Sequence, residues 1–392
     1  MLVNNVYYEQ KHPNEEYALI QYGKQAINKS DFRAIKSVLK SNWLTIGPKV
    51  EEFENEITKI CGAENFVVTS GTAALHCAYA AIGLEPGDEV ITPPITFVAT
   101  QSTAMQFGAK IRFCDIDTKT GNMDPNLVED LINDKTKAIT VVDFAGHPAD
   151  LDVFRSICDK YGIFLIEDAA HSIGSFYKGK PVGSIADLTT FSFFPTKNFT
   201  TGEGGAVSST NASLLDLARK FGRQGLVRDP EKFKNKVDGR WHQEVHKIGI
   251  NYRLSDILCA LGISQINRIY RFKQIRNDIF KFYNENLKDI PEIQLPVKEN
   301  YADPMWHLYP VRVKNGMRNE FYEYLWEFDI RVQVNYVPAY FHPVFSENGY
   351  NKGLCPVAEQ FYDEELSLPM QANLTKRDLN KIVKVTKQFF GH

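Results

Sequence analysis

The sequence has no arrangement of cysteines that would bind a metal ion or form a disulfide framework. Its 392 residues include only six cysteines, and no two of them form a CxxC pair. Zinc sites and disulfide-rich folds both depend on clustered cysteines, so neither is predicted. The scattered pattern instead indicates reduced cysteines that pack inside a cytoplasmic protein. They are Cys61, Cys77, Cys114, Cys158, Cys259 and Cys355.

Excess positive charge and long hydrophobic runs are also absent. The formal net charge is −3, which provides no electrostatic attraction to nucleic acid or to an anionic membrane. No apolar run approaches the roughly 18 residues that a membrane-spanning helix needs. The stretch from Met1 to Glu16 is polar and lacks the apolar centre of a signal peptide. We therefore expect a cytoplasmic protein with neither a nucleic acid nor a membrane partner.

What is present is the composition of a folded protein with a large core, since 43% of the residues are hydrophobic and 24% are charged. Short apolar runs alternate with helical stretches in the first half of the chain. This alternation favours an α/β fold, with a seven-stranded, mostly parallel sheet and helices on both faces. The apolar runs are 66–69, 89–92, 111–116, 138–143, 163–167, 188–193 and 205–209, and the helical stretches between them include 97–107, 125–133 and 150–161.

The pattern changes after Trp306, where short strands are predicted at 307–313 and 331–336 with helices at 318–328 and 376–390. This mixture indicates a smaller α+β domain at the C-terminus. A long amphipathic helix that ends near residue 287 joins it to the sheet. The predicted organisation is a lead-in segment (1–30), a large domain (31–266), and a linking helix with the small domain (267–392).

One lysine, Lys197, stands close behind the apolar run 191–194 and ahead of the glycine-rich turn 202–205. Lysine is usually a solvated surface residue. An apolar strand that leads into it suggests that it is held inside, where desolvation lowers its pKa and makes it a usable nucleophile and base. The chemistry that most often needs such a lysine is Schiff-base formation with a carbonyl, notably that of pyridoxal phosphate (PLP). The alternative is that Lys197 has no catalytic role and is an ordinary lysine at the end of a strand, beside a turn.

Polar and aromatic side chains follow other predicted strands, at the edge where ligands bind in parallel sheets. Asp168 ends the apolar run 163–166, where a carboxylate costs several kcal/mol unless it is paired. The ring nitrogen of PLP would be such a partner, although Asp168 could instead cap the next segment. His171 could contact the ring, or be structural. Phe97 follows the strand at 89–92 and places an aromatic ring near the pocket.

A strand, a small-residue turn and a helix follow one another in residues 66–82, with the turn at Ser70–Ala74. The free N–H groups and the dipole of such a helix N-terminus favour phosphate. The alternative is an ordinary turn of an α/β protein. Trp43, in the polar turn 42–48, is a candidate for lining a pocket or for packing.

Taken together, these stretches resemble the DegT/DnrJ/EryC1/StrS aminotransferases, which are fold-type-I PLP enzymes. Each motif is weak alone, but the set occurs in the family's order across most of residues 20–370. The matching stretches are Ser70–Leu75, Glu167–His171, Phe191–Phe193 with Lys197 and Asn198, Thr201–Gly205, and Gly249–Leu254.

The resemblance implies roles for particular residues. Lys197 would bind PLP covalently and move a proton between the amino donor and the cofactor, which would cycle through pyridoxamine phosphate. Asp168 would pair with the ring nitrogen, Phe97 would stack on the ring, and His171 would lie near it. Asn251 would reach the phosphate from a neighbouring subunit, which implies a homodimer with shared sites. The phosphate would also be held by Gly71, Thr72, Ala73 and Ser192.

Within the family, the chain is most similar to members that aminate C4 of a UDP-linked 4-keto-6-deoxy-N-acetylhexosamine in pseudaminic acid biosynthesis, with L-glutamate as donor. The stretches that carry this likeness are Asn42–Pro48, Val142–Gly146, Trp306–Pro310, Val334–Pro338 and Leu366–Pro369. The residues expected to bind the sugar nucleotide are Tyr22, Asn42, Trp43, Leu44, Thr45, His307 and Tyr336, with packing as the alternative for His307.

The chain departs from the family at two positions, since many members have histidine where it has Phe194 and Asn335. Both departures concern substrate contacts and leave Lys197 in place.

Other readings remain open. The first is amination at C3 or C4 of a dTDP- or GDP-linked sugar.

A second alternative is different PLP chemistry, such as C3 deoxygenation or amination of an inosose ring. The family's deoxygenating branch replaces the lysine with histidine, so Lys197 argues against that branch. A third alternative is a non-catalytic binding or regulatory protein. It predicts loss of Lys197, Asp168 or Asn251, and all three are present. A dinucleotide-binding dehydrogenase is poorly supported, because no GxGxxG follows the first predicted strand.

Overall fold

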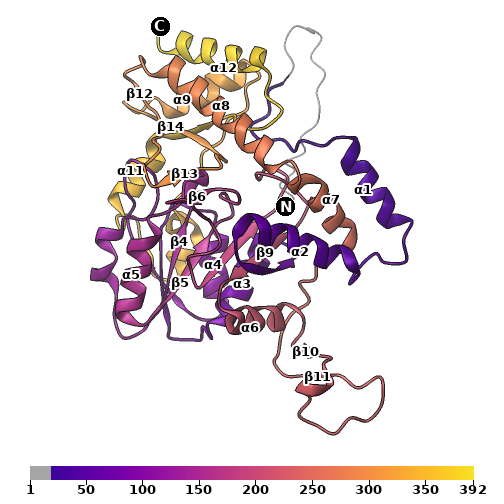
Figure 1. Ribbon diagram of the computed structural model, residues 1–392. Coiled ribbons are helices and arrows are strands. Elements are labelled where there is room, and N and C mark those ends of the chain that lie inside the picture. The colour runs from indigo at the N-terminus through magenta and orange to yellow at the C-terminus, as the bar shows by residue number, and fades with distance from the viewer. Residues whose placement is uncertain (1–18) are drawn as a thin grey trace.

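The computed structural model describes residues 19–392, and Figure 1 shows a sheet-containing body with a smaller C-terminal part above it. The stretch Met1 to Glu16, for which no signal-peptide centre is predicted, lies outside the described residues. Within residues 19–392, no helix is long and apolar enough to cross a membrane. All six cysteines are buried and unpaired.

The central sheet has seven strands in the order β1-β9-β8-β5-β4-β2-β3. Both contacts of β9 are antiparallel, and the remaining pairs are parallel. The prediction of a seven-stranded, mostly parallel sheet is therefore confirmed. The strands are β1 (Glu64–Val68), β2 (Glu89–Thr92), β3 (Lys110–Phe113), β4 (Thr136–Val142), β5 (Phe164–Asp168), β8 (Leu188–Ser192) and β9 (Gly205–Ser209).

Helices cover both faces of this sheet, so its strands are apolar on both sides. On β1, Phe66 and Val68 pack into one hydrophobic cluster with α3 and α6, whereas Val67 packs into another with α2 and α7. This alternation explains why the strands read as continuous apolar runs. The helices are α1 (Lys29–Leu39), α2 (Pro48–Cys61), α3 (Gly71–Ala81), α4 (Ala99–Met105), α5 (Leu151–Tyr161), α6 (Ala212–Gly222) and α7 (Asp256–Ile266).

The C-terminal part is built on a second sheet, in the order β12-β14-β15, with a hydrophobic cluster of its own. Figure 1 shows α8, α9 and α12 packed beside it. Its elements are α8 (Ile269–Leu287), β12 (Ile293–Gln294), β14 (Tyr309–Val313), α9 (Arg318–Glu327), α10 (Pro343–Glu347), α11 (Pro356–Glu364), β15 (Glu365–Leu368) and α12 (Lys376–Phe389).

Two local predictions are wrong. Residues 331–336 form no regular strand, because only one isolated bridge, from Gln333 to Ser367, joins them to β15. The backbone N–H of Asn335 donates instead to the side chain of Glu365. The predicted helix at 125–133 consists of two 3-10 turns, Pro125–Leu127 and Glu129–Leu131.

A long connection between α6 and α7 projects from the body as an arm, seen at the lower right of Figure 1. Its short strands β10 (Leu226–Val227) and β11 (Glu244–Val245) pair antiparallel. A small sheet elsewhere contains β6 (Phe176–Tyr177), β7 (Lys180–Pro181) and β13 (Ala302–Asp303).

Candidate active site

A pocket of about 430 Å³ lies where the central strands end. The turn after β8, the N-terminus of α3 and the loop after β2 all contribute to its wall, as parallel-sheet topology predicts. Eight predicted site residues line it: Gly71, Thr72, Phe97, Asp168, His171, Ser192, Lys197 and Tyr336.

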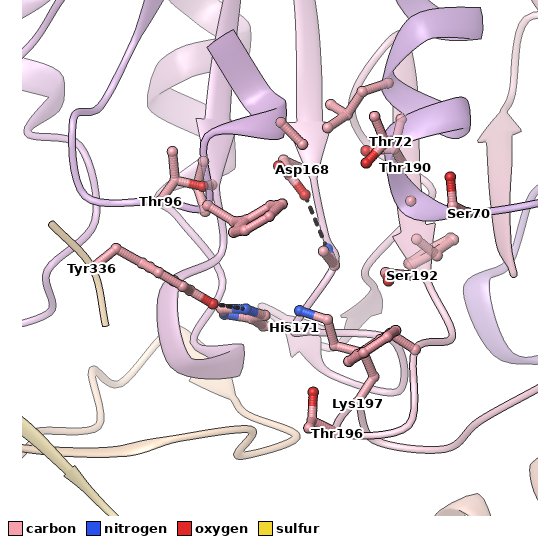
Figure 2. Close-up of a pocket in the computed structure, with 18 of the residues that line it drawn as sticks. Ser70, Thr72, Thr96, Asp168, His171, Thr190, Ser192, Thr196, Lys197 and Tyr336 are labelled. Atoms are coloured by element: carbon pink, nitrogen blue, oxygen red, sulfur yellow. Dashed lines mark hydrogen bonds between the residues drawn. The ribbon is translucent and has the colours of Figure 1, made fainter. Parts of the chain in front are cut away.

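Lys197 is held on the tight turn that follows β8, where its backbone N–H donates to the carbonyl of Phe194 at 2.9 Å. Figure 2 shows its amine pointing into the pocket without a hydrogen bond to the side chains drawn. Burial lowers the pKa of Lys197 to about 8, against a smaller opposing effect of Asp168. A pKa near 8 leaves a minor part of the amine neutral near physiological pH, and this part can act as a nucleophile or base.

Asp168 is only 6% exposed, at the end of β5. The hydroxyl of Thr100 donates to its Oδ2 at 2.7 Å, and the N–H of Ala170 donates to its Oδ1 at 3.2 Å. Burial raises the pKa of Asp168, while these two donors and Lys197 lower it. A protonated ring nitrogen in the pocket would provide a positive partner that favours the ionised form of Asp168.

The N-terminus of α3 offers a binding site for an anion. A Cβ atom on Gly71 would lie 2.8 Å from the Cβ of Ser192, so only glycine allows this close approach between the helix and β8. The hydroxyls of Thr72 and Ser192 line the pocket beside it. Ala73 differs from its prediction: it lies outside the lining, and its N–H donates to Ser70 Oγ at 3.1 Å. These groups suit a phosphate.

Aromatic and imidazole rings form the opposite wall. The hydroxyl of Tyr336 lies 3.1 Å from Nε2 of His171, as drawn in Figure 2. Burial lowers the pKa of His171 well below its usual value, which keeps this ring neutral. His307 packs behind it, at 4.3 Å between ring centroids, and is not part of the lining. Phe97 is 59% exposed, so its face is free to stack on a planar ring.

Several predicted residues lie away from the pocket of their own chain. The hydroxyl of Tyr22 donates to Asn335 Oδ1 at 2.8 Å, beside Tyr336. Asn251 is exposed and forms a backbone bridge with Arg223. The segment Asn42, Trp43, Leu44 and Thr45 is exposed as well, and is tied to the start of α7 through a bridge from Thr45 to Ser255.

The predicted site residues did not include one residue that lies behind the pocket lining, nor several that belong to the lining. Thr100 is the clearest case, because its hydroxyl orients Asp168 from a helix 68 residues earlier in the chain. The sequence signal that could have pointed to Thr100 is its spacing of four residues from Thr96. In the structure the two hydroxyls lie 3.0 Å apart. The unpredicted lining residues include Ser70, Leu75, Thr190, Thr196 and Glu203.

A buried lysine of lowered pKa, a buried carboxyl group in the same pocket and an anion site at a helix N-terminus have the chemistry that a PLP enzyme needs. The chain belongs to the DegT/DnrJ/EryC1/StrS aminotransferase family, whose sequence profile matches residues 25–387. It is thus a PLP-dependent aminotransferase.

Relatives in sequence and structure agree with this assignment. The chain is 38% identical over 379 residues to the UDP-4-amino-4,6-dideoxy-N-acetyl-beta-L-altrosamine transaminase of Campylobacter jejuni, covering 94% of this chain and 96% of that protein. The structure of Helicobacter pylori PseC, an aminotransferase involved in pseudaminic acid biosynthesis, matches with a TM-score of 0.89 at 30% identity, over 95% and 100% of the two chains. A sugar aminotransferase of Streptococcus pneumoniae in its PMP form matches with a TM-score of 0.90 at 28% identity, over 95% and 99%.

The lowered pKa of Lys197 predicts how the protein without cofactor captures PLP. The rate of capture should rise with pH through about 8, because the nucleophilic neutral amine appears there rather than at the ordinary lysine pKa of 10.5. Stopped-flow absorbance across a pH series measures this rate. A midpoint near the ordinary value would show that the amine is not desolvated.

Proposed function

We propose that the protein transfers an amino group from L-glutamate to the C4 keto group of a UDP-linked 4-keto-6-deoxy-N-acetylhexosamine, in pseudaminic acid-type biosynthesis in the cytoplasm. The observation that carries the amino transfer is the amine of Lys197, which lines the same pocket as Asp168 and has no hydrogen bond to the side chains drawn in Figure 2. The choice of sugar is supported by the named activity of the Campylobacter jejuni relative, which is similar over almost the whole chain.

Five of the lining residues have a task in this proposal. When bound, PLP supplies the electron sink that makes the donor's Cα–H bond acidic. Lys197 would hold the cofactor covalently and would move the proton between the donor and the cofactor. Asp168 would keep the ring nitrogen protonated, Phe97 would stack on the ring, and Thr72 and Ser192 would hold the phosphate.

We further propose a homodimer with shared sites. Among the described residues, Lys197 is the only lysine or arginine that lines the pocket, whereas a nucleotide diphosphate needs cationic or N–H donors. A second subunit can bring them, together with Asn251. Large apolar side chains are exposed around α1 and on the arm, including Trp43 at 54%, Trp241 at 76% and Ile248 at 91%. Exposed apolar surface of this kind indicates an interface.

Mixing two inactive variants tests this sharing. If Asn251 acts in the partner's site, a mixed dimer of Lys197→Ala and Asn251→Ala subunits has one intact site and one doubly altered site. Random reassociation of equal amounts should then restore about one quarter of wild-type activity at limiting PLP, because half of the dimers are mixed. The assay compares the mixture before and after subunit exchange. Activity that stays at the mean of the two variants would show that each subunit works alone.

The sugar is tested with the reverse half-reaction. The PLP-loaded protein is offered the UDP-linked 4-amino-L-altro sugar, its D-configured epimer, and the dTDP- and GDP-linked analogues, and the cofactor spectrum is followed to pyridoxamine phosphate. Conversion only with the first compound supports the proposal. Conversion with another sugar keeps the aminotransferase and changes its substrate, and conversion with glutamate alone shows that the acceptor is wrong.

A further inference from the structure

Two carboxyl groups meet inside the protein, directly behind the cofactor pocket. Both Asp143 and Glu167 are 0% exposed. Strands β4 and β5 are parallel, with Val141 opposite Glu167. Asp143 follows Val141 by two residues, so its side chain lies on the same face of the sheet as that of Glu167. Diagonal neighbours on one face are within reach of long side chains.

Hydrogen-bond donors satisfy all but one of the four carboxyl oxygens. Oδ2 of Asp143 accepts from the hydroxyl of Ser172 at 2.6 Å, and Oδ1 accepts from the N–H of Ala149 at 2.9 Å. Oε2 of Glu167 accepts from the hydroxyl of Thr189 at 2.7 Å. Oε1 of Glu167 is buried and has no hydrogen bond of good geometry among the described residues, although the backbone N–H of Gly183 is near enough to lower the pKa of Glu167. A proton between the two carboxyl groups is the donor that this arrangement lacks.

The surroundings offer no positive charge to replace that proton. Neither carboxyl group forms an ion pair within residues 19–392, and no group of metal-ligating side chains occurs there. The titratable groups that act on the pair are Asp168, which adds negative charge, and the thiol of Cys61. Burial raises the pKa of Asp143 to about 7 and that of Glu167 well above its usual value. Two like charges in such a site favour one shared proton.

We propose that Asp143 and Glu167 share a single proton, and that this bridged pair holds in place the turn 169–172, which connects Asp168 to His171. Two contacts transmit the effect. The hydroxyl of Ser172 bonds to Asp143, and the backbone N–H of Asp143 donates to the carbonyl of Asp168 at 3.2 Å. Asp143 and Glu167 are thus positioning residues that do not touch the cofactor. The inference rests on the PLP site and is independent of which sugar is the substrate.

Counting protonated carboxyl groups tests the shared proton. The carboxylic-acid carbonyl band in the infrared spectrum is measured at neutral pH for Glu167→Gln, Asp143→Asn and the double variant. Each single variant should lose one acid group, and the double variant should lose only that one. Losing none in the single variants, or two in the double variant, would overturn the proposal.

A second buried carboxyl group provides the matched control. Glu365 is 0% exposed and burial raises its pKa to about 8, but it lies in the other sheet. Glu365→Gln should lose an acid group of its own, and this loss should add to that of Glu167→Gln. If the loss of acid groups in Asp143→Asn adds to that in Glu167→Gln in the same way, the pair does not share a proton.

The positioning role is tested by the affinity for PLP. Glutamine can bond to both Asp143 and Thr189 without titrating, whereas leucine fills the space without hydrogen bonds. Glu167→Gln should keep the dissociation constant of PLP within about twofold of wild type, and Glu167→Leu should raise it by about tenfold, the equivalent of about 1.4 kcal/mol. Equal affinity in the two variants would overturn the positioning role. If Glu167→Leu does not fold, the same comparison is made with Asp143→Asn and Asp143→Leu.

The pH dependence of stability gives a further readout. A raised pKa in the folded state means that stability falls as pH rises from the carboxyl group's ordinary value toward the raised one. The melting temperature of the wild type should therefore fall more steeply with rising pH than that of Glu167→Gln. The slopes of the free energy of unfolding against pH should differ by the equivalent of about one bound proton. Parallel curves would contradict a proton held by this pair.

Discussion

Lys197→Ala is expected to abolish the visible absorbance of lysine-bound PLP and to lower the transamination rate by about 10³-fold or more. The change removes both the covalent attachment and the base that moves the proton, and general acid–base catalysis alone is worth about 10²–10⁴-fold. The effect should be large because Lys197 is the only lysine that lines the pocket in the described chain. Absorbance spectra and steady-state rates provide the measurement. An unchanged spectrum would remove Lys197 from this role.

Lys273 is the matched control for this variant. It is also a buried lysine with a lowered pKa, but its amine is bonded to Asp303 at 2.7 Å and to the carbonyl of Gly174 at 3.0 Å. Lys273→Ala should lower the melting temperature, since it leaves these partners unsatisfied, and should keep the spectrum of bound PLP. The comparison separates the loss of an attachment point from a general effect of removing a buried amine.

Asp168→Asn should still bind PLP but lose about 10²–10³-fold in turnover, which is the size of effect seen when a preorganised charge stabilisation is removed. Asparagine has nearly the same shape and can keep the bond from Thr100. It cannot hold a proton on the ring nitrogen, so the cofactor becomes a weaker electron sink. The measurement is the single-turnover rate with glutamate at saturating PLP. A rate near that of the wild type would contradict the pairing of Asp168 with the ring.

Thr100→Ala distinguishes the charge of Asp168 from its orientation. The variant removes the 2.7 Å bond from the hydroxyl, which is one of the groups that lower the pKa of Asp168, but keeps the carboxyl group itself. The loss of one hydrogen bond to a charged group is worth about 1.5–3 kcal/mol, so the rate should fall by about 10- to 100-fold, less than in Asp168→Asn. A larger loss in Thr100→Ala would mean that orientation, rather than charge, limits the reaction.

Local sequence signals were sufficient for the strands and for the residues that follow them. Most residues of the central strands are buried, so strands such as β1 and β4 contain apolar runs that stand out from their surroundings. Asp168 ends β5, while Gly71 and Lys197 follow β1 and β8 within a few residues, and parallel strands place these ends at one edge of the sheet. Residues 331–336 were misread because polar and apolar residues alternate in them as in a strand, although only one isolated bridge joins the segment to β15.

The sequence by itself predicted which chemically useful side chains lie near the sheet edge, and the tertiary structure decided which of them meet. Thr100 reaches Asp168 only because α4 packs against the end of β5. Trp43 and Asn251 belong to two of the motifs that carry the family resemblance, but both lie outside their own chain's pocket. Asp143 and Glu167 face each other because of the register between β4 and β5. Periodicity along a chain reports burial, whereas contacts between distant segments depend on strand register and helix packing, which no local pattern encodes.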